Sequence, residues 1–354
     1  MPASHHVLQL IYELLNKHCD EELEEYNNKR LSDVVDWSEI MKQTQQVGDN
    51  IFSIDIMDRG KGFTSAYLIR GKKLALIDCG PTSSADALLA GLQELGIDPF
   101  ELDYIIVTHI HLDHAGGAGY LAEKLPQLKV LVHEKGAKHL VDPSRLAAGA
   151  REYWGEVFPV FGEIVPVPSL RVQALQDGAE IDLGGGRRLK VLDTVGHSPH
   201  HHVFYDSDTR GLFSGDALGL YFPRLSAFLD DNIIIPGAPH PINLEMMLAS
   251  IQKMALLNVE TIYFSHFGSK KHGQAIIERM LGQFSVWSGI IKKVSKAGQP
   301  LETAIEQINN YVFRSMFNQG YNLAEHSELS SDKERVDQTL VNSVIGFWHY
   351  LTRQ

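Results

Sequence analysis

The sequence has only two cysteines among its 354 residues, Cys19 and Cys79. Their contexts differ, and their spacing does not indicate a metal or redox pair, so a reducing cytoplasm is the expected location. The chain also lacks an apolar run of about 18 residues and an N-terminal stretch with the features of a secretory signal. We therefore expect no targeting signal and no membrane span.

An excess of positive charge is missing as well. Lys and Arg total 32 against 44 Asp and Glu, which gives a formal net charge of -12, and no Lys/Arg-rich tract is present. Nucleic acids are bound through basic surfaces, so nucleic acid is not an expected partner. The shares of hydrophobic residues (44%) and charged residues (21%) are ordinary for a globular protein and predict a packed, enzyme-sized domain.

Three segments follow from the residue patterns. Residues 1–46 have apolar side chains at helical spacing and predict a helical N-terminal extension. Residues 47–272 alternate strand-like and helix-like runs, as in an α/β layered fold, with the sheet beginning at Gly48. Residues 273–354 predict a helical C-terminal region, whose last helix has an apolar face formed by Val336, Leu340, Val344 and Phe347. Packing is the expected role of the helical ends, and a lid over the active site or a homodimer arm are the alternatives.

The stretch "HIHLDH" follows the apolar run "YIIV" and supplies His109, His111, Asp113 and His114. These side chains therefore fall at the carboxyl end of a buried strand, where α/β layered folds usually place their sites. Imidazole nitrogens and carboxylate oxygens are ligands that borderline divalent cations prefer. A purely polar loop would not need this spacing. We expect His109 and His111 to share one ion, and Asp113 and His114 to be available for a neighbouring ion.

Glycines and three further strand ends support a metal site. Gly116, Gly117 and Gly119 follow the motif and are expected to let the backbone approach closely. His197, Asp216 and His266 each follow another apolar strand. Four strand ends that deliver His or Asp to one edge of a sheet can build a two-metal site, with Asp216 suited to bridge the ions.

The motif H-x-H-x-D-H resembles the signature of the metallo-β-lactamase superfamily, and the later His and Asp positions match that family in order. The resemblance covers about Val47 to His266 and implies a four-layered αββα sandwich, here with helical N- and C-terminal extensions. It implies one ion on His109, His111 and His197, a second on Asp113, His114 and His266, and Asp216 between them. It further implies that Asp78 supports the ligand loop and that His201 supports the ligands from behind.

Two residues after Asp216 are candidates for the substrate pocket, Tyr221 and His240. Simple packing or helix entry is the alternative for each of them. The ligand types fit Zn, Fe and Mn equally well, so we expect two divalent metal ions without choosing the element.

The chemistry expected of such a site is hydrolysis by a metal-activated water. Two ions would lower the pKa of a bridging water and polarise a carbonyl or phosphoryl oxygen, and Asp113 would help to orient the resulting hydroxide. We expect a small-molecule substrate with an ester, thioester or lactone bond.

Two alternatives remain open, a mononuclear iron dioxygenase acting on a persulfide and a non-catalytic metal-binding regulator. Within the resemblance, flavin-linked diiron reductases carry Glu where His111 stands and need a flavodoxin-like domain, so that activity is disfavoured. RNA-processing members are disfavoured by the acidic charge. The largest antibiotic-hydrolysing class has a cysteine among the ligands of its second metal. This chain has Asp216 at the related bridging position, so that class is disfavoured as well.

Overall fold

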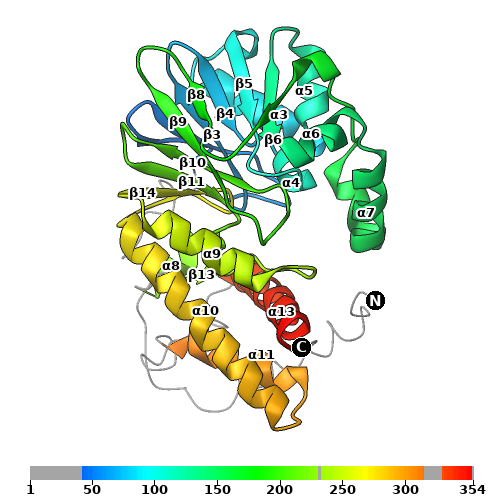
Figure 1. Cartoon of the computed structure of the whole chain (residues 1–354). Helices are drawn as coiled ribbons and strands as arrows, with labels where there is room; N and C mark the ends of the chain where they lie inside the picture. Colours follow the sequence, from blue (N-terminus) through cyan, green and yellow to red (C-terminus); the bar gives the residue numbers. More distant parts are fainter. Residues whose placement is uncertain (1–41, 230–232, 315–328, 353–354) are drawn as a thin grey trace. The chain divides into compact units, whose positions relative to one another are not determined.

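A computed structural model describes residues 42–229, 233–314 and 329–352 (Figure 1). The chain divides into two compact units. The first takes its described residues from Met41–Gly219 and Glu245–Leu281, and the second from Leu220–Leu244 and Gly282–Gln354. The predicted N-terminal helices lie outside the described residues, and the segment limits at residues 47 and 273 stay predictions.

The first unit contains a seven-stranded sheet whose strands follow one another in sequence order. The strands are β1 (Thr44–Gly48), β2 (Ile51–Asp55), β3 (Ser65–Arg70), β4 (Leu74–Ile77), β5 (Leu102–Ile106), β6 (Lys129–His133) and β7 (Val172–Leu175). Neighbours from β1 to β4 are antiparallel, and neighbours from β4 to β7 are parallel. The parallel part places the carboxyl ends of β4, β5 and β6 at one edge of the sheet.

The predicted start of this sheet at Gly48 was wrong, because β1 already begins at Thr44. This strand lies at the edge of the sheet and exposes Gln45 and Gln46. Its polar sequence therefore lacks the apolar alternation that marks a half-buried strand.

A second sheet of six strands completes the sandwich, in the order β15-β14-β11-β10-β9-β8. Its strands are β8 (Glu180–Asp182), β9 (Arg188–Asp193), β10 (His202–Asp206), β11 (Gly211–Gly215), β14 (Thr261–Phe264) and β15 (Ser269–Lys271). Only the pairing of β11 with β14 is parallel. As a result, the chain leaves β11 and β14 at the same edge, which brings the segments that follow them together.

Alternate side chains of each strand build two separate cores. Between the sheets, Ile69 and Ile106 of the first sheet pack with Phe204 and Phe213 of the second. The opposite face of the first sheet packs under helices, and its buried side chains include Leu88 of α3 (Ala85–Glu94). Each fully buried aliphatic or aromatic side chain stabilises the fold by about 1.5–3 kcal/mol.

The remaining helices of this unit lie outside the sheets (Figure 1). They are α4 (Leu112–Ala115), α5 (Ala118–Lys124), α6 (Glu134–Val141), α7 (Ser144–Trp154) and α9 (Leu244–Ala255). Helix α9 borders the second sheet, since Ser250 Oγ donates a hydrogen bond to the carbonyl of Val195, just beyond β9. The fold is mixed α/β, with two packed sheets between helices, which confirms the predicted fold class.

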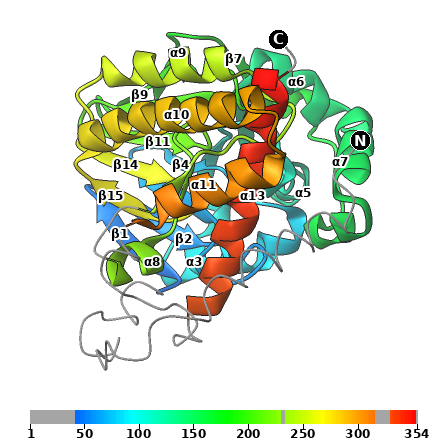
Figure 2. The same ribbon diagram turned by 90° about the horizontal axis from the view of Figure 1, so that it is seen from below.

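The second unit is mainly helical. It holds α8 (Pro223–Phe228), α11 (Leu301–Val312), α13 (Ser330–Thr352), most of α10 (Gly273–Lys296) and a small sheet of β12 (Leu220–Tyr221) and β13 (Ile234–Ile235). Figure 2 shows α11 beside α13. The four apolar positions predicted for the last helix are fully buried, and the Phe347 ring contacts Phe284 and Trp287 of α10. No helix among the described residues is long and apolar enough to cross a membrane.

Candidate metal centre

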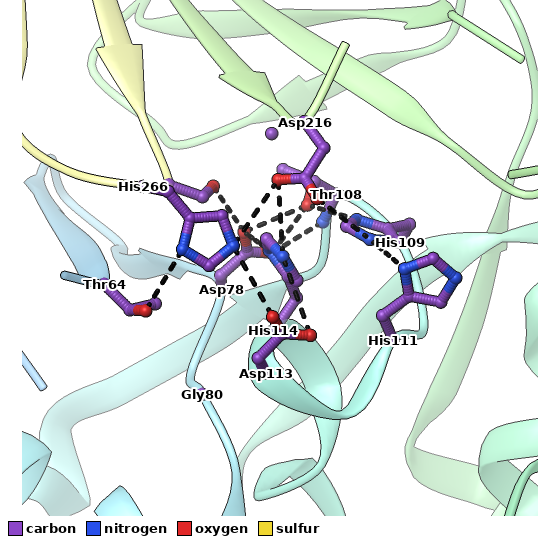
Figure 3. Close-up of polar contacts among 12 residues, drawn as sticks. Thr64, Asp78, Gly80, Thr108, His109, His111, Asp113, His114, Asp216 and His266 are labelled. Atoms are coloured by element: carbon purple, nitrogen blue, oxygen red, sulfur yellow. Dashed lines mark hydrogen bonds and ion pairs between the residues drawn. The ribbon is translucent and has the colours of Figure 1, made fainter. Parts of the chain in front are cut away.

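The structure brings all seven predicted ligands together at one edge of the first unit. Figure 3 labels six of them: His109, His111, Asp113, His114, Asp216 and His266. His109 and His111 follow β5, and α4 begins directly after them and carries Asp113 and His114. The other three ligands come from the second sheet, since His197, Asp216 and His266 follow β9, β11 and β14. The strand ends that sequence patterns single out therefore converge in space.

The first group of ligands consists of three imidazoles. His111 Nδ1 lies 2.9 Å from His109 Nε2 and 3.1 Å from His197 Nε2. Ligand atoms held at about 2.1 Å from one ion in a tetrahedral arrangement lie about 3.4 Å apart. The three nitrogens are therefore spaced for a single ion.

The second group combines a carboxylate with two imidazoles. Asp113 Oδ2 lies 3.5 Å from His266 Nε2, and Asp113 Oδ1 lies 3.9 Å from His114 Nε2. These distances also suit ligands of one ion, allowing for small adjustments of the side chains.

Asp216 lies between the two groups, and its two oxygens face different ones. Oδ2 is 3.4 Å from His197 Nε2 and 4.0 Å from His109 Nε2. Oδ1 is 3.4 Å from His114 Nε2 and 3.7 Å from His266 Nε2. A carboxylate in this position can contribute one oxygen to each of two ions.

Hydrogen bonds on the far side of two imidazoles fix their tautomers. His114 Nδ1 donates to Asp78 Oδ2 at 2.9 Å, and His266 Nδ1 donates to the Phe63 carbonyl oxygen at 3.2 Å. In the neutral rings, both Nε2 atoms are then without a proton and point into the centre. Among the described residues, the buried atoms His114 Nε2 and Asp216 Oδ1 find no hydrogen-bond partner. Metal ions would satisfy these atoms, so the residues present fit a metal centre.

Burial and neighbouring charges set the ionisation of the ligands. Burial is the main cause that lowers the pKa of His109, and the charges of neighbouring histidines lower it further. The same two causes lower the pKa of His111 to about 3. Burial would raise the pKa of Asp113, but the charges of His114, His266 and Arg59 outweigh it and hold that pKa well below its usual value. Neutral imidazoles and ionised carboxylates are the forms that bind metals.

His114 differs from the other histidines. Burial would lower its pKa, but the carboxylates of Asp216, Asp113 and Asp78 outweigh burial and raise the pKa well above 6.5. The ring therefore lies among three carboxylates whose negative charges favour a positive charge at this place. A bound cation would supply that positive charge.

The two predicted supporting residues both touch the ligand segments. Asp78 accepts hydrogen bonds from the backbone of Thr108 (2.7 Å), from Ser265 Oγ (2.8 Å) and from His114. It thereby ties the end of β4 to the ends of β5 and β14. His201 Nε2 accepts a hydrogen bond from the backbone N–H of Asp216 at 3.1 Å, which holds that residue from behind.

The glycines after the motif lie where other chain segments pass closely, as predicted. A Cβ on Gly119 would lie 1.8 Å from the carbonyl oxygen of Val165, and a Cβ on Gly117 would lie 3.2 Å from that of Gly80. Any larger residue at position 119 would therefore collide with the backbone.

Sequence reasoning missed three residues beside the second group of ligands: Asp58, Arg59 and Thr64. Arg59 Nη2 donates to Asp113 Oδ2 at 3.0 Å, and Thr64 Oγ1 lies 3.2 Å from His266 Nδ1. The sequence did contain a pattern that could have identified two of them, because Asp58 and Arg59 closely follow β2, a strand with a buried end.

The two predicted pocket residues lie in the second unit. Tyr221 belongs to β12 and is 7% exposed, and burial raises the pKa of its hydroxyl to about 12. The His240 ring lies 4.8 Å from that of His349. Their predicted place in the substrate pocket stays a prediction.

Another group of potential ligands consists of His133, Asp193 and His202. Its hydrogen bonds do not leave unprotonated ring nitrogens facing a common point, as they do in the main centre. The backbone N–H of Lys135 donates to His133 Nδ1, so the neutral ring carries its proton on Nε2, which faces Asp193 at 3.7 Å. His202 Nε2 lies 2.7 Å from the same carboxylate. We interpret this group as a hydrogen-bonded His–Asp–His arrangement.

Comparisons with known proteins show relatives with the same kind of fold. The protein ST1585 of Sulfurisphaera tokodaii, described as metallo-beta-lactamase fold-containing, is 29% identical over 226 residues, which are 62% of this chain and 79% of that protein. The crystal structure of ST1585 matches with a TM-score of 0.54 at 26% identity, covering 66% of this chain and 85% of that one.

Other relatives differ in length or agree in fold alone. The flavo-diiron protein FprA2 of Clostridium acetobutylicum is 29% identical over 195 residues, and the match covers 51% of this chain but only 43% of that protein. A beta-lactamase domain protein from Burkholderia ambifaria shares the fold at 17% identity, with a TM-score of 0.56 over 86% of this chain and 87% of that one.

The family assignment follows from the sequence match together with the fold. The pattern of the Metallo-beta-lactamase superfamily matches residues 59–266, which is more than half of the chain and runs from Arg59 to the last predicted ligand. The chain belongs to the metallo-β-lactamase superfamily.

Proposed function

We propose that this protein is a metal-dependent hydrolase that uses two divalent ions to cleave an ester, thioester or lactone. The observation that carries the proposal is the position of Asp216, whose two oxygens face separate groups of ligands at 3.4 Å each. When bound, two ions would activate a shared water and polarise the carbonyl oxygen of a substrate.

The residues of the chain would contribute orientation and charge. The ionised Asp113, whose side chain is 17% exposed, would accept a hydrogen bond from the attacking water. Asp78 and His201 would keep His114 and Asp216 in place during the reaction. The chain supplies no positively charged tract for a polyanion, so a small molecule is the proposed substrate.

Zn, Fe and Mn all suit the ligand set. The match to a flavo-diiron protein adds weight to iron as one candidate. The chain spans less than half of that relative, and the imidazole of His111 stands where the diiron resemblance expects Glu, so a hydrolase remains the leading proposal.

The test is a panel of lactones, thioesters and phosphoesters, assayed with purified protein before and after chelation. We expect metal-dependent turnover of a carbonyl substrate, loss of turnover in His111→Ala, and unchanged turnover in His139→Ala, a histidine on α6 outside the centre. A metal-loaded protein that hydrolyses none of the panel would contradict the proposal.

A second candidate is a mononuclear iron dioxygenase acting on a persulfide. One observation favours it: Asp216 Oδ2 lies within 4.0 Å of His109 Nε2 and of His197 Nε2. Two imidazoles and one carboxylate would suffice to hold a single iron ion. One iron per chain with oxygen uptake on glutathione persulfide would select this candidate over the hydrolase.

The cytoplasmic location and the homodimer through the helical ends also belong to the proposal. The measured mass of the full chain in solution tests the dimer, since a monomeric mass at micromolar concentration would reject it.

A further inference from the structure

The loop between β2 and β3, residues 56–64, contacts two ligands of the second ion site, Asp113 and His266. We propose that Arg59 is a positioning residue that orients Asp113 directly and His266 through Asp58 and Thr64, and so sets the affinity of the second ion. This inference rests on the proposed two-ion centre and names the part of the chain that controls its second half.

A continuous series of contacts carries the inference. Arg59 Nη2 donates to Asp113 Oδ2 at 3.0 Å, and Arg59 Nε donates to Asp58 Oδ2 at 3.2 Å. Thr64 Oγ1 donates to the same Asp58 oxygen at 3.4 Å and lies 3.2 Å from His266 Nδ1. The series begins at one ligand of the second group and ends at another.

The loop itself is held in a defined shape. Asp55 accepts hydrogen bonds from the backbone N–H groups of Met57 (2.9 Å) and Gly62 (2.8 Å), so one carboxylate holds two separate parts of the loop together. Arg59 has a φ of 53°, in the left-handed region. This conformation costs a non-glycine residue about 1–2 kcal/mol, so the surrounding contacts must outweigh that cost.

Two aromatic rings fix the direction of the Arg59 side chain. Its guanidinium carbon lies 4.8 Å from the centre of the Phe63 ring and 5.7 Å from a ring of Trp154. The Phe63 ring also lies 5.0 Å from His266, so the same aromatic residue contacts the positioning residue and a ligand. Contacts on the two ring faces restrict the rotamers that the arginine can adopt.

Arginine suits this position better than lysine. Its planar fork presents several N–H donors at fixed angles and can reach Asp58 and Asp113 at the same time. A carboxylate oxygen has two lone pairs, so Asp113 can keep the bond to Arg59 while the other lone pairs face the ion. Partners of this kind, behind a ligand, typically change metal affinity about 10- to 100-fold when removed.

The test is a metal titration of the chelator-treated full chain, with bound metal measured by mass spectrometry at each free-metal concentration and without substrate. In Arg59→Met we expect the affinity for the second ion to fall about 10- to 100-fold while the first ion binds as in the wild type. Arg59→Lys keeps the charge but not the fork and should weaken the second ion in the same direction. The matched control is Arg188→Met, which removes an exposed arginine paired with Glu180.

Each outcome decides the matter. Unchanged or tighter binding of the second ion in Arg59→Met overturns the inference, and wild-type binding in Arg59→Lys shows that charge alone suffices and also overturns it. If Arg59→Met does not fold, as judged by circular dichroism, the Lys variant decides. A wild-type chain that takes up one ion only overturns the two-ion function as well, whereas a second ion that binds with wild-type affinity in every variant overturns only the role of Arg59.

Discussion

Replacing Asp78 by asparagine should destabilise the metal-free protein strongly, although the two side chains have the same shape. The Asp78 carboxylate accepts from four donors: Thr108 N (2.7 Å), Thr108 Oγ1 (2.9 Å), His114 Nδ1 (2.9 Å) and Ser265 Oγ (2.8 Å). In Asp78→Asn, one oxygen becomes an NH₂ group and faces donors. A hydroxyl can turn to accept from this group, but the His114 N–H cannot.

The magnitude follows from the bonds that are lost. Hydrogen bonds to a charged group contribute about 1.5–3 kcal/mol each, and Asp78 is 1% exposed, so water cannot replace them. In Asp78→Asn one hydrogen bond is lost, and the remaining ones go to a neutral amide instead of a carboxylate. The free energy of unfolding should therefore fall by about 3–5 kcal/mol.

Urea unfolding of chelator-treated protein measures this effect, because a lower midpoint with an unchanged slope reports a change in stability. The control is Asp98→Asn, an exposed carboxylate that accepts a hydrogen bond from the backbone N–H of Phe100, and it should cost less than about 1 kcal/mol. A single neutral hydrogen bond contributes only ~1 kcal/mol. A free energy of unfolding for Asp78→Asn within about 1 kcal/mol of the wild type would therefore refute the reasoning.

Three other predictions follow from the geometry. His197→Ala should lose only the first ion and His266→Ala only the second, which metal analysis of the two variants checks; loss of both ions in each would contradict separate groups. Gly119→Ala should destabilise the fold by roughly 3 kcal/mol or more, because its Cβ would meet a carbonyl oxygen at 1.8 Å. Gly149→Ala on α7, where a Cβ meets nothing within 4 Å, should instead stabilise by up to about 1 kcal/mol in thermal unfolding, and equal effects of the two would count against the packing. Burial and the neighbouring His133 charge lower the pKa of His202 to about 4, against 6.5 unperturbed. The unfolded chain therefore binds the extra proton first, so the metal-free protein loses stability as pH falls from about 6.5 to about 4. The variant His202→Gln should lose less over that range, and an identical pH profile would contradict this assignment.

Four ligands, His109, His197, Asp216 and His266, could be predicted from sequence because each closely follows an apolar run. The parallel pairs β4–β5 and β11–β14 carry such residues to one edge of a sheet, and β9, which precedes His197, runs in the same direction as β11 because both are antiparallel to β10. Packing of the last helix was readable for a similar reason, because the helical period of its apolar residues depends only on neighbours in sequence.

Other features depend on contacts that no local pattern records. Arg59 and Asp113 are 54 positions apart, and only the folded chain brings the guanidinium to that carboxylate. The edge strand β1 was missed because Gln45 and Gln46 need no apolar partner on an exposed edge. The division of the chain into two units likewise follows from long-range packing, not from a change in composition.

The central claim, a two-ion hydrolase, is tested most directly by adding metal stepwise to chelator-treated protein and following both bound metal and hydrolysis. The account predicts that two ions bind per chain and that turnover of a thioester or lactone rises mainly with the second equivalent. Full turnover at one equivalent, or one bound iron with oxygen uptake on glutathione persulfide and no hydrolysis, would contradict it.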